Sequence, residues 1–251
     1  MSNKRVIARL DVKGRNLIKS VHLEGLRIIG DPQIHAEQYY IEGADEILYM
    51  DTVASLYGRN TLSDIVERTA ENVFIPITVG GGIRSVDDVR NLLHCGADKI
   101  ALNTAAIERP HLISDIASIF GSQCVVVSVE ALRNADGGWS VFTSNGREKS
   151  KYELDEWVTK AVDLGAGEIL LTSIDYEGTN KGFDLELLEL VANSVNVPVI
   201  VSGGMGKASD MVSAVSRGAD AVAVADLIHY KKTTISEIKK FAHSQSVNVR
   251  L

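Results

Sequence analysis

The feature of this sequence that most constrains its fold is a long internal repeat. The stretch IPITVGGGIRSVDDVRNLLHCGADKIAL (75–102) aligns with VPVIVSGGMGKASDMVSAVSRGADAVAV (197–224), and Gly81 matches Gly203, an offset of 122 residues. A shorter pair, ADEIL and AGEIL, keeps the same offset. Solenoid repeats have much shorter periods, so this is not a solenoid. The repeat therefore indicates a fold made of two similar halves.

Both halves alternate short β-branched runs with amphipathic stretches of helical spacing, such as 85–98 and 184–195. Buried Val- and Ile-rich strands that alternate with helices are typical of a parallel sheet. Eight such units in 251 residues match a (β/α)₈ barrel in number and in length. We expect an α/β protein with a single TIM-barrel domain over residues 1–251, built from two (β/α)₄ half-barrels at about 1–122 and 123–251. The expected strands are 6–11, 46–51, 75–80, 99–103, 125–130, 168–173, 199–203 and 221–226.

Composition excludes several classes of partner. The 26 basic and 33 acidic side chains give a net charge of −7 without a basic block, which argues against nucleic acid or an anionic membrane as the main partner. No apolar run approaches the roughly 20 residues of a membrane helix, and the N-terminus lacks the apolar segment of a signal peptide. The two cysteines and six histidines show no metal-ligand spacing. We expect a cytoplasmic protein with no metal and no cofactor.

Glycines follow two of the expected strands at equivalent places, Gly81 and Gly82 in the first half and Gly203 and Gly204 in the second. In a TIM barrel, the active site lies at the carboxyl ends of the strands. Backbone without side chains lets N–H groups approach a ligand closely, and phosphate is the ligand that such donors favour. A plain turn would explain one glycine run. Two matching runs favour two phosphate sites, and thus an elongated substrate with a phosphate at each end.

Two carboxylates end expected strands on opposite sides of the barrel, Asp11 on the first and Glu130 on the fifth. The two-residue periodicity of strands directs both side chains inward. Such a pair across the mouth has the arrangement of a general acid and base. Either carboxylate alone could instead satisfy N–H groups of a loop. Arg9 shares the inward face with Asp11, and its cation would favour the ionised form of Asp11, which hinders that group as an acid.

Four charged residues begin expected strands at the opposite, N-terminal end of the barrel: Arg5, Glu46, Lys99 and Glu168. Two cations and two anions can form a closed ring of ion pairs, and burial of charges requires such pairing. The ring could be a polar plug beneath the core. It could also be a gate, because ion pairs can open where packed leucines cannot.

The chain resembles the cyclase subunits of imidazole glycerol phosphate synthase nearly from end to end. The resemblance lies in ordered blocks that include ARLDVK, LEGLRIIGDP, EGADEILYMD, IPITVGGGIRSVDDVRNLL, GADKIALNTAA, FGSQCVVVSVE, LGAGEILLTSID, GTNKGFDLEL and VPVIVSGGMG. It implies a (β/α)₈ lyase of histidine biosynthesis that works in a glutamine amidotransferase complex. A glutaminase subunit would dock at the N-terminal face and release ammonia, which would pass the charged ring and cross the barrel.

At the mouth, the resemblance implies that ammonia attacks a phosphoribulosyl-formimino aminoimidazole carboxamide nucleotide. The products are imidazole glycerol phosphate and the aminoimidazole carboxamide nucleotide. Asp11 and Glu130 take the catalytic positions, and Lys19 lies in a long loop after the first strand that would act as a lid. The implied substrate and phosphate contacts are Lys19, Gly81, Gly82, Asn103, Thr104, Thr172, Gly178, Gly203, Gly204, Ala225 and Asp226.

The sequence departs from the family pattern at the mouth. Glu130 stands where the family has Asp, Arg9 replaces a small residue, Asp226 replaces a serine beside a phosphate site, and the first loop differs. We expect Asp226 to repel phosphate. Because the gate residues are intact, an alternative function is an ammonia-conducting partner of a sugar amidotransferase in surface polysaccharide (acetamidino sugar) biosynthesis. A two-phosphate sugar isomerase of the same fold would need no ammonia, so the charged ring argues against it.

Overall fold

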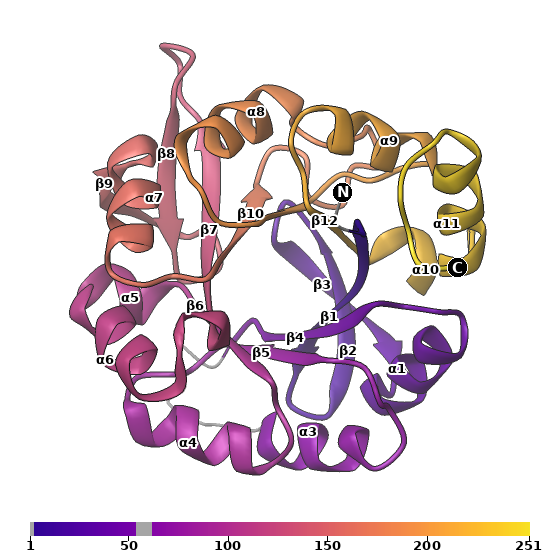
Figure 1. The fold of residues 1–251 in the computed structure, drawn as a ribbon, viewed down its shortest axis with the longest axis horizontal. Coiled ribbons are helices and arrows are strands. Elements are labelled where there is room, and N and C mark those ends of the chain that lie inside the picture. The colour runs from indigo at the N-terminus through magenta and orange to yellow at the C-terminus, as the bar shows by residue number, and fades with distance from the viewer. Residues whose placement is uncertain (1–2, 54–61) are drawn as a thin grey trace.

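The computed structural model describes residues 3–53 and 62–251. Eight parallel strands close into a barrel in the order β1, β4, β5, β6, β7, β10, β11, β12, because β10 also pairs with β7. Figure 1 looks down this barrel, with the helices around it. The expected TIM barrel is confirmed. Its strands are β1 (Arg5–Lys13), β4 (Glu46–Asp51), β5 (Ile77–Gly80), β6 (Lys99–Leu102), β7 (Val125–Arg133), β10 (Glu168–Ser173), β11 (Val199–Ser202) and β12 (Ala221–Val224).

Helices cover the outer face of the barrel, and their apolar sides form one core with it, in which Trp157 and Tyr49 are fully buried. A smaller apolar cluster fills the interior, with Ile7, Leu48 and Leu170 among its members. No helix in the described ranges has both the length and the hydropathy needed to span a bilayer. The helices are α1 (Pro32–Ile41), α3 (Leu62–Ala70), α4 (Val86–His94), α5 (Thr104–Glu108), α6 (His111–Phe120), α7 (Leu154–Asp163), α8 (Leu185–Ser194), α9 (Ser209–Ser216), α10 (Asp226–His229) and α11 (Ile235–Ser244), with a 3₁₀ turn η1 (Ser122–Cys124).

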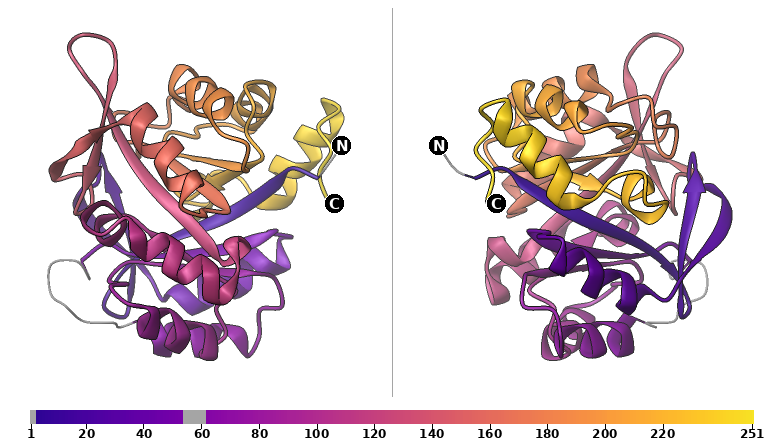
Figure 2. Two further views of the ribbon diagram at one scale, coloured as in Figure 1. Left: turned by 60° about the vertical axis from the view of Figure 1, so that its left-hand side comes forward. Right: turned by 90° about the vertical axis from the view of Figure 1, so that its right-hand side faces the viewer.

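The segment after β1 is a β-hairpin rather than the long loop expected from the sequence. It consists of β2 (Asn16–Val21) and β3 (Glu24–Gly30), and a second hairpin, β8 (Trp139–Thr143) and β9 (Glu148–Glu153), follows β7. The first hairpin lies at the end of the barrel opposite the two chain termini (Figure 2). The turns of the two hairpins are equivalent positions of the internal repeat, because Leu23 (φ 62°) and Asn145 (φ 60°) are 122 residues apart.

The register of the sheet also shows that Asp11 and Glu130 are equivalent positions. Asp11 pairs with Met50 on β4, and Glu130 pairs with Thr172 on β10. Met50 and Thr172 differ by the repeat offset of 122 residues. The two halves therefore place a carboxyl group at the same point of the first strand, on opposite sides of the barrel.

Each copy of the repeat contains an Ala-Asp pair, Ala97-Asp98 and Ala219-Asp220, and its aspartate makes the same hydrogen bonds at the N-terminal end of the barrel. The backbone N–H of Ile77 donates to Asp98 Oδ2 at 2.8 Å, and the N–H of Asp98 donates to the carbonyl of Ile77 at 2.8 Å. Val199 and Asp220 make the same two bonds, at 3.2 and 2.9 Å. Each aspartate thus satisfies an N–H group at the start of the preceding barrel strand.

We expect Asp98→Ala to lower the free energy of unfolding by roughly 1–3 kcal/mol, because the N–H of buried Ile77 loses its partner. Urea denaturation of the purified protein measures this change. The matched control is Asp115→Ala on the exposed side of α6, which we expect to change stability by no more than about 0.5 kcal/mol. Equal losses in the two variants would contradict the role given to Asp98.

Candidate active site

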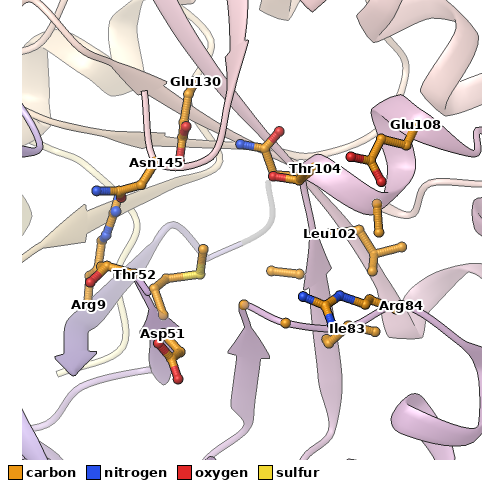
Figure 3. Close-up of a pocket in the computed structure, with 16 residues that line it drawn as sticks. Arg9, Asp51, Thr52, Ile83, Arg84, Leu102, Thr104, Glu108, Glu130 and Asn145 are labelled. Atoms are coloured by element: carbon orange, nitrogen blue, oxygen red, sulfur yellow. The ribbon is translucent and has the colours of Figure 1, made fainter. Parts of the chain in front are cut away.

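A cavity of about 260 Å³ opens at the carboxyl ends of β4, β5, β6 and β7. Figure 3 shows Arg9, Asn145 and Glu130 on one side of it, with Arg84 and Glu108 on the other. The expected site residues Gly81, Gly82, Asn103, Thr104 and Glu130 all line this cavity.

The glycine turns that flank the mouth are required by backbone packing. Gly81 (φ 102°) lies against the end of β4, where an added Cβ would overlap the carbonyl oxygen of Asp51. Gly203 (φ 93°) lies against β10 in the same way, with an added Cβ 2.9 Å from the carbonyl oxygen of Ser173. Positive φ and close approach both favour glycine. Backbone packing therefore requires a glycine at both turns, and the turn at Gly81 also exposes backbone atoms to the cavity.

The second glycine turn borders a cavity of only about 20 Å³, with room for about one water molecule. Lys19 on β2 and Glu177, after β10, form a buried ion pair beside it, with side chains only 3% and 5% exposed. This pair narrows the cavity. The expected residues that line it are Lys19, Gly178, Gly203, Gly204, Ala225 and Asp226.

The two cavities are equivalent corners of the repeat. Asn103 precedes α5 with φ −127° and ψ −90°, and Ala225 precedes α10 with φ −131° and ψ −74°. Each short helix thus begins directly at the mouth, next to a glycine turn. The corner residues pair across the repeat offset as Gly81 with Gly203, Gly82 with Gly204, Asn103 with Ala225, and Thr104 with Asp226.

Asp226 does not present an unbalanced negative charge to the second corner. Its Oδ1 accepts a hydrogen bond from Lys232 Nζ at 2.5 Å, and Lys232 also donates to Asn180 Oδ1 at 3.2 Å. The repulsion expected from the sequence is therefore offset by a neighbouring cation that sequence reasoning did not consider.

Arg9 and Asp11 form a buried ion pair inside the mouth. Arg9 Nε donates to Asp11 Oδ1 at 2.9 Å, and Arg9 Nη1 donates to Thr172 Oγ1 at 3.1 Å and Ser202 Oγ at 2.9 Å. Burial opposes the charge of Arg9, but Asp11 and other carboxylates raise its pKa above the ordinary value. Thr172, an expected substrate contact, is thus already bonded to Arg9. Asp11 Oδ2 is buried and has no hydrogen-bond partner among the described residues.

Glu130 lies across the barrel from Asp11 and has a different environment. Burial raises the pKa of Glu130 to about 7, although a bond from the N–H of Gly146 (2.7 Å), the charge of Arg9 and the side chain of Asn103 lower it. Gly146 belongs to the turn between β8 and β9. Near neutral pH, Glu130 therefore exchanges between protonated and ionised forms, as a group that transfers protons must.

The four charged residues at the opposite end form the closed ring anticipated from the sequence. Arg5 contacts Glu46 and Glu168 at 2.9 and 2.6 Å, and Lys99 contacts the same two carboxylates at 2.8 Å each. Burial alone would lower the pKa of Arg5. The negative charges of Glu168 and Glu46 raise it by more, so the pKa of Arg5 lies above its ordinary value. Thr78 Oγ1 adds a bond to Glu46 at 2.5 Å.

Sequence reasoning missed three contributors to the mouth: Glu177, Lys232 and the Asn145–Gly146 turn. An Asn-Gly pair between two alternating runs is a strong hairpin signal, so that turn could have been found. Glu177 and Lys232 carry no such local signal. In the part of the chain that the structure describes, no three His, Cys, Asp or Glu side chains are grouped to hold a metal ion.

Comparison with known proteins agrees with this geometry. A family model described as histidine biosynthesis protein matches residues 5–234. The chain is 67% identical to the imidazole glycerol phosphate synthase subunit HisF of Legionella pneumophila over 207 residues, 82% of this chain and 98% of that protein. It is 49% identical to the subunits of the same name from Mycobacteroides abscessus and Bifidobacterium adolescentis, over 98% of each chain. The chain therefore belongs to the histidine biosynthesis protein family, in its HisF branch.

Proposed function

We propose that this chain is the ammonia-dependent cyclase of imidazole glycerol phosphate synthase. It converts the phosphoribulosyl-formimino aminoimidazole carboxamide nucleotide into imidazole glycerol phosphate and the aminoimidazole carboxamide nucleotide. The observation that carries this proposal is the mouth itself, where two equivalent glycine-lined corners flank the carboxyl groups of Asp11 and Glu130, in a chain of the HisF branch.

The two corners suit the two phosphate ends of this nucleotide. The first corner is open, and the side-chain hydroxyl of Thr104 and the backbone beside Gly82 can donate to a phosphate there. The second corner is too small for phosphate as it stands. A phosphate enters it when Lys19 leaves Glu177 and binds the phosphate instead, which exchanges one charged partner for another.

The carboxyl pair supplies the proton transfers. Ring closure and cleavage require a group that donates a proton and a group that accepts one, on opposite sides of the bound nucleotide. Glu130 is the donor, because its raised pKa keeps a large fraction protonated near neutral pH.

Ammonia enters from the other end of the barrel. The ring of Arg5, Glu46, Lys99 and Glu168 lies at the N-terminal face, and large apolar side chains are exposed at that face. Ile41 and Phe74, 82% and 76% exposed, precede β4 and β5, and Phe74 packs edge-on against Tyr40. Apolar side chains that lie next to one another at the surface, as exposed Phe74 and half-buried Tyr40 do, favour a protein interface. A glutaminase subunit docks here and delivers ammonia at the ring.

The activity is tested with the nucleotide and an ammonium salt, without a glutaminase. We expect the purified chain to form imidazole glycerol phosphate and Glu130→Gln to lower kcat about 10²- to 10⁴-fold, because the proton donor is lost. Glu71→Gln, an exposed glutamate outside the mouth, is the matched control and should leave kcat unchanged. A folded wild-type chain that forms no product would refute the proposal.

The pH dependence follows from Glu130. Because its pKa is about 7 and the donor must be protonated, the rate per concentration of free ammonia is expected to be highest below pH 7 and to fall above it. Rates must be expressed per free ammonia, since ammonium ion loses its proton as the pH rises. Glu130→Gln should remove this limb from its residual activity. A wild-type limb that persists in Glu130→Gln would assign the titration to another group.

A further inference from the structure

Arg9 occupies the centre of the mouth. Its side chain lines both corner cavities and is only 4% exposed. From β1 it reaches Thr172 on β10 and Ser202 on β11, so its guanidinium crosses part of the barrel interior. A substrate that spans the two corners must pass over this group.

The barrel does not require a cation at this position. Arg9 pairs with Leu48 on β4, and Ser128 pairs with Leu170 on β10. Leu48 and Leu170 differ by the repeat offset, so Ser128 is the counterpart of Arg9 in the second half. The same fold thus accommodates a small hydroxyl at the equivalent point. The contacts that the Arg9 side chain makes, rather than the packing of the barrel, therefore account for an arginine at this position.

Arg9 makes the two equivalent carboxyl groups unequal. Asp11 Oδ1 accepts from the guanidinium at 2.9 Å, while Glu130 Oε2 accepts from the neutral backbone N–H of Gly146 at 2.7 Å. The charge-assisted bond from Arg9 fixes the orientation of the Asp11 carboxyl group, and the bond to Glu130 carries no such charge. In the part of the chain that the structure describes, nothing bonds to Oδ2 of Asp11, so this atom is available to a bound molecule.

Within residues 3–53 and 62–251, no other cation forms an ion pair with Asp11. Lys19 is paired with Glu177. His229 on α10 is electrostatically coupled to Asp11, but burial lowers the pKa of His229 to about 3, so its imidazole is neutral above that pH. Among the described residues, the charges of Glu177 and Glu130 act on Arg9, and His229 interacts with Asp11 and Lys19.

We propose that Arg9 is a positioning residue that orients Asp11 as the proton acceptor of the reaction and so leaves proton donation to Glu130. This inference rests on the proposed function. A proton moves from the substrate to Asp11 Oδ2, and another moves from Glu130 to the departing group. The net charge of the carboxyl pair is unchanged by the two transfers, and solvent exchange afterwards restores each group.

The test is chemical rescue of Arg9→Ala. The variant is assayed with the nucleotide and an ammonium salt, with and without added guanidinium ion. We expect Arg9→Ala to lower kcat about 100-fold, the effect of a misplaced catalytic group. Millimolar guanidinium ion should restore most of the lost rate, whereas urea, with nearly the same shape but no charge, should not. Arg9→Lys should retain more activity than Arg9→Ala.

Control variants separate this role from a structural one. Arg217→Ala removes a half-exposed arginine that pairs with Glu189 on the outer helices, and it should behave as wild type. Arg9→Met keeps the volume of the side chain, so it serves if Arg9→Ala fails to fold in a thermal-unfolding control. Equal rescue by urea and guanidinium, or an Arg9→Lys variant no more active than Arg9→Ala, would overturn the inference alone. An inactive wild-type chain would overturn the proposed function, and the inference with it.

Discussion

The pairing between β7 and β10 is the interaction on which the rest of the structure depends, because it closes the sheet. In a closed parallel barrel every strand ends at the same rim, so side chains far apart in sequence meet around one mouth. Closure places Asp11 and Glu130 on opposite walls and brings the two glycine turns to the same rim. It also places the first residues of the strands at the other end, where the ring of ion pairs forms.

The internal repeat gives the mouth its symmetry, and a few side chains break it. The two corners have the same backbone, yet the first is an open cavity and the second is narrowed by Lys19 and Glu177. The two carboxyl groups have the same register, yet of the two only Asp11 forms an ion pair with a described residue. These differences allow a symmetric scaffold to hold a substrate in one direction, since the two ends of the site are chemically distinct.

Much of this arrangement could be predicted from the sequence, because it follows from periodicity. The two-residue period directed Arg9, Asp11 and Glu130 inward, and the strand starts anticipated the charged ring. The third strand begins at Ile77 rather than residue 75, because Pro76 has no N–H to donate to the ladder. The hairpin after β1 was missed, since its turn, with His22 and Leu23 at positive φ, lacks a glycine at its centre. The Lys232–Asp226 pair could not be predicted either, because it depends on tertiary contacts between side chains.

In the proposed function, the two corners and the carboxyl pair bind one nucleotide across the mouth. This binding mode can be checked in a crystal structure of the chain with the two-phosphate nucleotide. We expect one phosphate beside Gly82 and Thr104, the other beside Gly204, and Lys19 separated from Glu177. A nucleotide bound through one corner only, with the Lys19–Glu177 pair intact and the second cavity still closed, would contradict it.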